Sequence, residues 1–154
     1  MINTNNIQLV LVVYWELLDP NLTITADLYS NQLDRLREAL VRNRPSLVNR
    51  KGVILHHDNA KPHTAKQTQQ KIKELGWEVM PHPPYSLDIV PSDYHLLLSL
   101  SDHLMGKRFQ NEEVKEDITS FIASKPHDFF EKGIKKFFNR WQTVVDNEGQ
   151  YIVD

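Results

Sequence analysis

A strand, a helix and a second strand follow one another in the middle of this chain, and this order constrains the fold more than any other feature. The predicted strands are the short apolar segments 52–56 and 77–80. Pro62 lies near the first position of the helix between them, where a missing N–H costs nothing, and Gly76 provides a left-handed end after Leu75. Because a crossover of this kind joins parallel strands, the sequence predicts an α/β fold.

The segment before this unit predicts another strand and a helix. Residues 9–15 are the longest apolar run, and we expect a strand over 7–15 that is buried on both faces. Thr25 can cap a helix from Ala26 to about Arg42, which Pro45 ends. The apolar run is far shorter than the roughly 20 residues of a membrane span, and uncharged residues precede it. We therefore expect a soluble chain with no signal peptide or transmembrane segment.

The second half of the chain predicts a stiff loop followed by helices. Four prolines within residues 81–91 exclude regular structure there. Ser92 can then cap a helix from Asp93 to about Met105, and apolar spacing predicts two more helices, around 114–122 and 134–145. The last helix carries an aromatic stripe whose spacing favours a buried face over a surface that stacks unpaired bases. The stripe consists of Phe129, Phe130, Phe137, Phe138 and Trp141.

Composition narrows the class of protein. The chain has 154 residues, enough for one domain with a sizeable core, and too many of them are apolar for a disordered chain. It contains no cysteine, which excludes a disulfide scaffold, a thiolate zinc site, an iron–sulfur cluster and a thiol nucleophile. A single α/β domain remains.

Positive charge is concentrated in one stretch, although the net charge is only −2. Ten of the 18 basic residues lie within residues 35–73, against only Glu38 and Asp58, and we call these ten the basic belt. Such a belt is typical of a surface that binds a polyanion such as DNA, and a solvated face of two helices would explain it equally well. The belt consists of Arg35, Arg37, Arg42, Arg44, Arg50, Lys51, Lys61, Lys66, Lys71 and Lys73. The candidate DNA contacts are Arg42, Arg44, Arg50, Lys51, Lys61 and His63.

Two aspartates occupy places from which α/β proteins commonly bind ligands. Asp58 comes just after the predicted strand 52–56, and Asp93 begins a helix after the proline-rich loop. Ligands tend to bind at the carboxyl ends of strands, and carboxylate oxygens are ligands for Mg²⁺. Two such ions would clamp the attacking and leaving oxygens of a phosphodiester. The ordinary alternative is that Asp58 only caps the following helix and Asp93 only favours a helix N-terminus.

The histidines allow a different metal site. Residues 56–58 read His-His-Asp, and His63, His82 or His95 could complete an iron site of two histidines and one carboxylate. That kind of site usually lies in a β-rich barrel, whereas here a helix follows at once. Histidines beside strands are more often hydrogen-bonded structural residues, so we prefer the carboxylate hypothesis.

Two segments give the sequence a resemblance to mariner-family transposases. They are HHDNAKPH at 56–63 and HPPYSLDIVPSDYHL at 82–96, and the 34 residues between Asp58 and Asp93 match the interval between that family's second and third catalytic carboxylates. The resemblance runs from about residue 9 to the end. It implies an RNase H-like mixed sheet flanked by helices, with Asp58 and Asp93 as catalytic residues and ligands of Mg²⁺, for which Mn²⁺ can substitute. It also implies DNA as the partner, no small-molecule substrate, and the nucleus as the location.

The sequence also departs from the family pattern. The family's first catalytic aspartate lies in an Asp-Glu-Lys-Trp strand upstream of the segment at 9–15, and this sequence contains no such motif. Trp15 runs straight into Glu16, so the predicted sheet lacks its first strand and part of a hairpin. We expect residues 1–154 to form a single incomplete RNase H-like transposase catalytic domain, without a helix-turn-helix DNA-recognition domain. The unpaired sheet edge favours a homodimer or poor solubility.

The resulting hypothesis is a remnant of a mariner-type transposase catalytic core, from a family that cuts and joins DNA with Mg²⁺ and that also includes a domain fused to a SET-domain histone methyltransferase. With two of three catalytic carboxylates, we expect it to be inactive alone. Glu16, Asp19 or Asp27 could replace the first, although each has an ordinary explanation as a turn or helix-start residue. The alternative is a non-catalytic nucleic-acid-binding or protein-interaction module that keeps the fold. The two hypotheses differ in whether Asp58 and Asp93 matter for activity.

Overall fold

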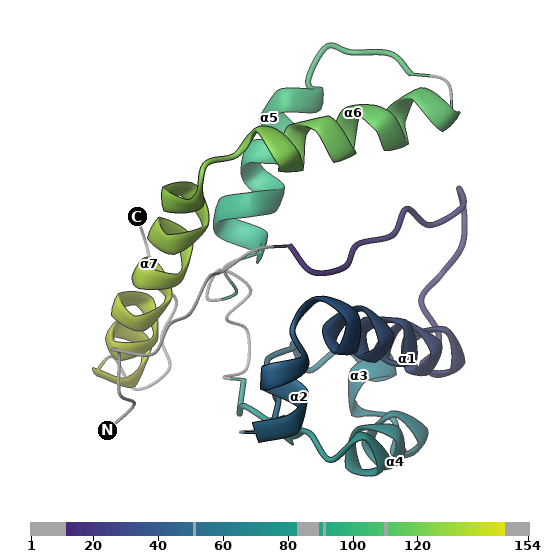
Figure 1. Ribbon diagram of the computed structural model, residues 1–154, viewed down its shortest axis with the longest axis vertical. Coiled ribbons are helices and arrows are strands. Elements are labelled where there is room, and N and C mark those ends of the chain that lie inside the picture. Colours follow the sequence, from purple (N-terminus) through teal and green to yellow (C-terminus); the bar gives the residue numbers. More distant parts are fainter. Residues whose placement is uncertain (1–11, 51, 83–89, 91, 110, 147–154) are drawn as a thin grey trace. The chain divides into compact units, whose positions relative to one another are not determined.

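The computed structural model describes residues 12–50, 52–82, 90, 92–109 and 111–146. Residues 7–11 of the first predicted strand and most of the predicted proline-rich loop lie outside these ranges. The chain divides into Val13–Pro84, which we call the N-terminal unit, and Tyr85–Asp154 with Met1–Val12, which we call the C-terminal unit (Figure 1). Within the described ranges, no helix is long and apolar enough to cross a membrane.

The described part of the N-terminal unit contains four helices and two short strands. Thr25 begins the first helix as predicted, because its Oγ1 accepts a hydrogen bond from the N–H of Leu28 at 3.2 Å. Pro45 follows this helix and begins a second one, which was not predicted. The elements are α1 (Ala26–Asn43), α2 (Pro45–Arg50), β1 (Ile54–Leu55), α3 (Lys61–Thr64), α4 (Lys66–Leu75) and β2 (Glu78–Val79).

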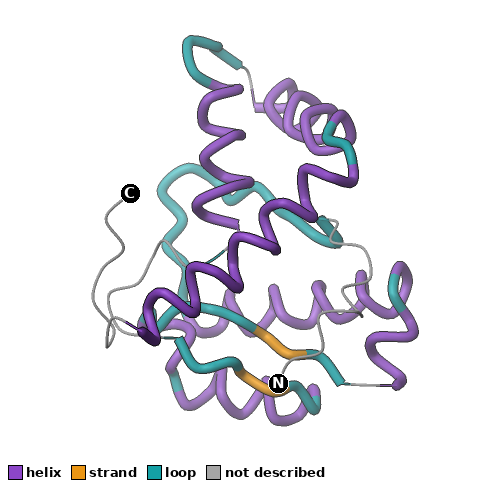
Figure 2. Tube along the Cα trace, turned by 90° about the vertical axis from the view of Figure 1, so that its left-hand side faces the viewer, coloured by secondary structure: helices purple, strands orange, loops and turns teal. Residues whose placement is uncertain are grey.

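The two strands lie side by side and pair in parallel, which confirms the central prediction from the sequence (Figure 2). Leu55 lies opposite Val79, and the N–H of Met80 donates to the carbonyl of Leu55 at 2.8 Å. Gly76 ends α4 in the left-handed conformation, with φ 69°, as its position in the sequence predicted. The carboxyl ends of both strands therefore lie at the same edge of the pair.

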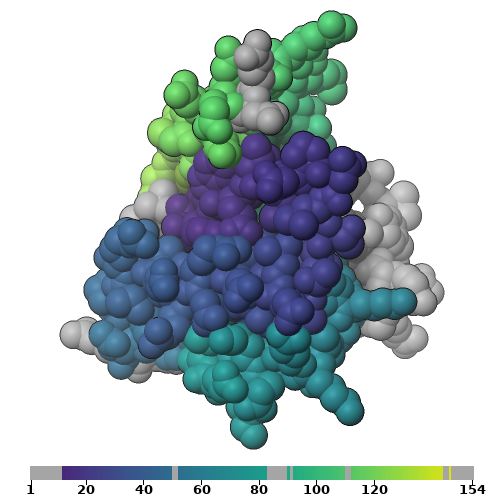
Figure 3. Space-filling view, turned by 90° about the vertical axis from the view of Figure 1, so that its right-hand side faces the viewer, coloured from purple at the N-terminus to yellow at the C-terminus, as the bar shows by residue number. Residues whose placement is uncertain are grey.

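A small apolar core holds α1 and α4 against the strand pair. Leu33 and Leu40 come from α1, Ile72 from α4 and Trp77 from the residue before β2, and each is at most 7% exposed. Leu33 and Leu40 are two helical turns apart, so they lie on the same face of α1. Figure 3 shows the outside of this packing, where the blue surface of α1 and α2 borders the teal surface of α4. The core thereby fixes the backbone that leaves β1.

The helix predicted over 61–75 is divided into α3 and α4. Ala65 interrupts it with an extended backbone, at ψ 143°. The fully buried Thr68 donates from its hydroxyl to the carbonyl of Pro62 at 2.6 Å. In a continuous helix that carbonyl would accept the N–H four residues later, so the Thr68 hydroxyl replaces a backbone donor.

The strand predicted over 7–15 is wrong in the part that the structure describes, because residues 12–15 form no ladder. These residues are nevertheless half-buried, and Val13 packs against the core of the N-terminal unit. Apolar character therefore predicted the burial correctly. A strand also needs a neighbouring strand to exchange backbone hydrogen bonds with, and the apolar pattern contains no information about that neighbour.

The C-terminal unit is helical over most of its described part, as predicted. Its first element begins at Ser92 and is wound as a π-helix over six residues before the chain continues as an α-helix. The helix predicted from Asp93 to about Met105 is thus present, but its first part has a wider turn. The elements are η3 (Ser92–Leu97), α5 (Leu98–Leu104), α6 (Asn111–Ser124) and α7 (His127–Asp146).

Aromatic residues contribute most of the core of the C-terminal unit. Phe121 of α6 and Phe130 and Phe137 of α7 are each at most 8% exposed. The prediction that the aromatic stripe faces the core is therefore confirmed for Phe130 and Phe137. A polar contact joins the neighbouring helices, since Nε2 of His103 on α5 lies 2.7 Å from Oδ2 of Asp117 on α6.

Candidate functional site

Asp58 lies three residues beyond β1, at the edge where the carboxyl ends of the parallel strands meet. Its Oδ1 accepts two hydrogen bonds, from the N–H of Ala60 at 3.0 Å and from Nδ1 of His63 at 2.5 Å. Ala60 directly precedes α3, and no side chain of the described residues caps that helix. The predicted alternative of a simple helix cap is therefore wrong, because the carboxylate is bonded just outside the helix.

The carboxylate of Asp58 is ionised and partly open to solvent. Burial by itself would raise its pKa, but the hydrogen bonds from Ala60 and His63 hold the pKa below its usual value. The side chain is 34% exposed, and both of its hydrogen bonds within the described part of the chain fall on Oδ1. Oδ2 thus remains as an ionised oxygen donor, the ligand type that Mg²⁺ and Mn²⁺ prefer. Asp58 therefore offers one ligand oxygen to a divalent cation.

Tyr29 of α1 orders the imidazoles beside Asp58. Its hydroxyl lies 2.8 Å from Nδ1 of His57, and its ring centroid lies 4.1 Å from that of His63. Burial raises the pKa of Tyr29 to about 12, and burial together with the nearby His63 lowers the pKa of His57 to about 4. At neutral pH the phenol therefore donates to a neutral imidazole, which places the proton of His57 on Nε2. The sequence did not single out Tyr29, and its helical spacing from the core residue Leu33 was the only signal.

The ends of the two strands are tied together next to Asp58. Nε2 of His56 lies 3.1 Å from Nδ1 of His82, and the amide of Asn59 donates to the carbonyl of His82 at 3.0 Å. A cavity of about 290 Å³ opens here within the N-terminal unit, with His63 and His82 among its lining residues. The hollow at the strand ends is thus bounded by imidazoles on one part of its wall and by apolar residues such as Ile72 and Val79 on the rest.

The histidines do not converge on the iron site that the sequence allowed. Around Asp58, no three ligand atoms from histidine or acidic side chains of the described residues lie within 4.8 Å of one another. A further candidate, His95, is engaged elsewhere, because its Nε2 lies 2.6 Å from the carbonyl of Phe129. The imidazoles near Asp58 instead bond to Tyr29, to Asp58 and to one another, which is a structural role. The iron hypothesis is wrong for this arrangement.

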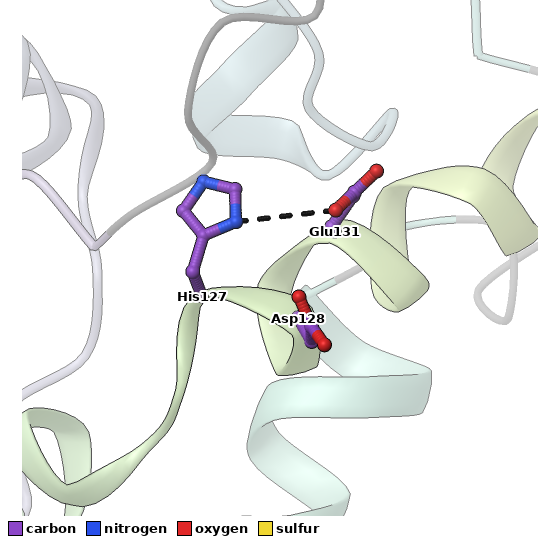
Figure 4. A group of neighbouring side chains, drawn as sticks. All are labelled: His127, Asp128 and Glu131. Atoms are coloured by element: carbon purple, nitrogen blue, oxygen red, sulfur yellow. Dashed lines mark ion pairs between the residues drawn. The ribbon is translucent and has the colours of Figure 1, made fainter.

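One cluster at the start of α7 does bring three possible ligand side chains together (Figure 4). The ligand atoms of His127, Asp128 and Glu131 lie within 4.8 Å of one another, and Nδ1 of His127 is 3.9 Å from Oε2 of Glu131. Lys135 contacts Glu131 at 2.6 Å, and this hydrogen bond lowers the pKa of the Glu131 carboxyl. Because an ammonium group already neutralises Glu131, we interpret the cluster as a surface ion-pair network.

Asp93 lies in the first turn of η3, in the C-terminal unit. Its side chain is exposed, and Oδ1 accepts a hydrogen bond from the hydroxyl of Ser92 at 3.3 Å. The N–H of Asp93 donates to the carbonyl of Val90 at 2.9 Å. Asp58 belongs to the N-terminal unit and Asp93 to the C-terminal unit.

Two acidic residues that could replace the family's first carboxylate are already engaged. Glu16 accepts hydrogen bonds from Nε and Nη2 of Arg35 at 2.9 and 3.0 Å, and also from the hydroxyl of Tyr14. Asp27 accepts a hydrogen bond from the amide of Gln67. A carboxylate held by a guanidinium through two hydrogen bonds is a poor ligand for a second cation. The structure thus gives both residues ordinary partners.

The basic belt is partly available to a polyanion. Two of its members are paired with carboxylates, Arg35 with Glu16 and Lys71 with Asp34, each at 2.9 Å. Among the predicted DNA contacts, Arg42 is exposed, and so is Lys61 at the start of α3. The other predicted contacts are half-buried, as Arg44 and His63 are, or lie outside the described residues, as the side chain of Arg50 and the whole of Lys51 do.

Known proteins match most of the chain. A family model described as "Transposase (partial DDE domain)" matches residues 11–50. The histone-lysine N-methyltransferase SETMAR of Homo sapiens is 45% identical over 141 residues, which are 91% of this chain and 21% of SETMAR. The mariner Mos1 transposase of Drosophila mauritiana is 41% identical over 143 residues, which are 92% of this chain and 41% of that transposase. The chain thus spans less than half the length of these relatives.

Solved structures of Mos1 match the fold. The Mos1 catalytic domain with raltegravir and Mg superimposes with a TM-score of 0.86 at 41% identity, over 92% of this chain and 71% of that chain. The Mos1 paired-end complex with a left transposon end gives 0.84 at 41% identity, over 92% and 41% of the two chains.

The fold is that of an RNase H-like catalytic domain, which confirms the predicted fold class. It is defined by the parallel strands flanked by helices, by the ionised aspartate at the strand ends and by these superpositions. Two strands of its sheet are present among the described residues. The chain belongs to the mariner family of transposases and corresponds to part of their catalytic core, as the resemblance of the two sequence segments predicted.

Proposed function

We propose that this chain contributes Asp58 and Asp93 as two of the three catalytic carboxylates of a mariner-type core, and that it binds DNA and a divalent cation without cutting DNA by itself. In this proposal residues 1–154 act as one incomplete catalytic domain, as a homodimer in the nucleus. The observation that supports it most is the state of Asp58, which is ionised, bonded through one oxygen and not used as a helix cap. Metal-dependent phosphodiester chemistry needs such a carboxylate.

The cation of this proposal is Mg²⁺, with Mn²⁺ as a substitute, held by Oδ2 of Asp58 and the carboxylate of Asp93. The relative Mos1 was solved as a catalytic domain with Mg and with Mn. When bound, the ion would polarise a phosphate oxygen and stabilise the charge that develops at the scissile bond. The contribution of the protein is orientation, because His63 and the N–H of Ala60 hold Oδ1 and leave Oδ2 for the ion.

We expect no cleavage by the 154-residue chain alone, because two of the three acidic residues that could replace the family's first carboxylate are already engaged. Glu16 is held by Arg35 and Tyr14, and Asp27 by Gln67. Mg²⁺ demands near-ideal octahedral geometry, so two carboxylates without the third should hold it weakly. Mn²⁺ tolerates imperfect coordination better and is the better probe.

DNA is the partner in this proposal, and the exposed Arg42 and Lys61 are its first contacts. Mos1 was solved in a complex with a transposon end. Each cation that neutralises a phosphate adds about 0.9 to the slope of log affinity against log salt. The double variant Arg42→Ala/Lys61→Ala should therefore lower that slope by about 2. Lys115→Ala/Lys135→Ala, which removes the same charge from residues already paired with glutamates, should leave the slope unchanged.

Binding and nicking of supercoiled plasmid by one preparation test both parts of the proposal. The wild-type chain, Asp58→Ala, Asp93→Ala and the control Asp102→Ala, an exposed aspartate of α5, are compared with Mg²⁺ and with Mn²⁺. We expect salt-dependent binding by all four and nicking by none. Nicking that requires Asp58 or Asp93 would show that the chain is active alone. Binding that is flat across salt concentrations would rule out the basic belt as a DNA surface.

A further inference from the structure

The two residues that follow Asp93 are bonded to the backbone of α7. The hydroxyl of Tyr94 donates to the carbonyl of Gly133, and Nε2 of His95 donates to the carbonyl of Phe129 at 2.6 Å. Phe129 and Gly133 are four residues apart, so their carbonyls lie one above the other on the same face of the helix. Two consecutive side chains of η3 are thus tied to two successive turns of α7.

Gly133 allows η3 to come this close to α7. A Cβ atom at this position would lie 2.7 Å from Cδ2 of His95, closer than non-bonded carbon atoms approach. Glycine in the interior of a helix is destabilising relative to alanine, so its presence there needs a packing reason. The reason is the imidazole of His95, which covers this position and also stacks on the ring of Phe129 with centroids 4.1 Å apart.

Tyr94 is fixed at its ring as well as at its hydroxyl. The guanidinium carbon of Arg140 lies 4.7 Å from the centroid of the Tyr94 ring, within the range of a cation–π contact. One helix thus holds Tyr94 through both its backbone and a side chain.

These contacts determine where the backbone of Asp93 lies. Asp93 is exposed, whereas Tyr94 and His95 are half-buried. The π-helical segment η3 continues directly into α5, and the two together are still short for a helix that forms without tertiary contacts. Short π-helical segments are often found at functional sites, where surrounding contacts maintain them.

We propose that Tyr94, His95 and Gly133, which we call the α7 clamp, are positioning residues that fix Asp93 for metal binding. This inference rests on the proposed function, because it takes Asp93 as a ligand. A metal ligand is effective only when its surroundings hold it in place, and residues that orient ligands commonly change metal affinity by about 10- to 100-fold. The sequence Asp93-Tyr94-His95 then combines a ligand with the two side chains that place it.

Hydrogen exchange and Mn²⁺ affinity, measured on the same 154-residue chain, test the α7 clamp. Tyr94→Phe removes the hydroxyl that bonds to α7, and Gly133→Ala adds the colliding Cβ while favouring the helix. The matched controls are Tyr14→Phe, which removes a hydroxyl in the N-terminal unit, and Asn139→Ala, at an exposed position of α7. Both clamp variants should speed exchange in peptides that cover 92–97 and weaken Mn²⁺ binding by about 10-fold. The controls should change neither.

The possible results separate the inference from the proposed function. Faster exchange with unchanged Mn²⁺ affinity would overturn the clamp alone, and so would unchanged exchange in both variants. If Asp93→Asn leaves Mn²⁺ binding unchanged, or the wild-type chain binds no Mn²⁺, the proposed function fails and the inference falls with it. Should Gly133→Ala not fold, Tyr94→Phe decides, because loss of one hydroxyl adds no atom to the packed contact.

Discussion

Asp58 and Asp93 are held in two different ways. His63 and the N–H of Ala60 bond directly to the carboxylate of Asp58, so its surroundings set both its charge and its orientation. Asp93 keeps an exposed side chain, and the contacts of its neighbour Tyr94 with α7 set the position of its backbone. The difference means that Asp58 should respond to changes in the chemistry of one imidazole, whereas Asp93 should respond to changes in the packing of one helix.

The largest effect is expected from removing the core beneath Asp58. Trp77→Ala deletes a side chain that is 7% exposed and packs with Leu33 and Ile72, and it should lower the free energy of unfolding by about 3–5 kcal/mol. Urea denaturation followed by circular dichroism measures the loss. Phe137→Ala is the matched change in the core of the C-terminal unit, which contains Asp93. A loss below about 1 kcal/mol for Trp77→Ala would contradict a core that fixes the backbone at Asp58.

Lowering the pH from 7 to 5 should reduce the free energy of unfolding by about 1–2 kcal/mol, because a histidine next to Asp58 is half-buried in its neutral form. Burial and His63 lower the pKa of folded His57 from 6.5 to about 4, so between these values the unfolded chain binds a proton that the folded chain does not. Stability is therefore lost as the pH falls through this window. The lowered pKa of Asp58 adds a further loss at more acidic pH. In urea denaturation at both pH values, His57→Gln should lose less stability than wild type, and an equal loss would refute the assignment.

Two variants should distinguish the direct hydrogen bonding of Asp58 from the positioning of Asp93 through its neighbour. His63→Ala should raise the pKa of Asp58 toward its usual value and weaken Mn²⁺ binding by about 10-fold, because one hydrogen bond to the ionised oxygen is lost. Tyr94→Phe should weaken Mn²⁺ binding without changing that pKa. Carbon-13 NMR of the Asp58 carboxyl follows its titration directly. Equal pKa changes in both variants would remove the distinction between the two aspartates.

The smallest effect is expected at the cluster of His127, Asp128 and Glu131. Lys135→Ala breaks an ion pair whose lysine side chain is 68% exposed, and it should leave the Tm without measurable change. It should also leave Mn²⁺ affinity unchanged, because Asp58 and Asp93 are the proposed ligands. Thermal melting and a Mn²⁺ titration check both points. Tighter Mn²⁺ binding by Lys135→Ala would instead identify this cluster as the metal site.

Local patterns predicted the parallel crossover well, because the signals at Pro62 and Gly76 act within a few residues of where they stand. The break at Ala65 was missed, since it depends on a hydroxyl of Thr68 that replaces a backbone donor to the carbonyl of Pro62. The prediction of a strand over 7–15 was wrong in its described part for a related reason. Apolar side chains predict burial, but the pairing of a strand depends on a partner elsewhere in the chain.

The candidate site shows the same limit of local patterns. Asp58 and Asp93 were chosen as candidates from their places after a strand and before a helix and from the resemblance to mariner transposases, whereas the groups that contact them could not be predicted. Tyr29 is 28 residues from His57, and Gly133 is 39 residues from Tyr94. Contacts over such separations arise from tertiary packing. A glycine inside a helical pattern was the one local signal of the close contact with α7.

The proposal that Asp58 and Asp93 bind the same ion is best tested by a double-mutant cycle on Mn²⁺ affinity with Asp58→Ala and Asp93→Ala. If both carboxylates hold one ion, each single variant should lose most of the affinity, and the double variant should lose little more than either. The coupling energy should then be about 1–3 kcal/mol. Losses that simply add, or a loss confined to one of the two aspartates, would contradict a metal site that contains both carboxylates.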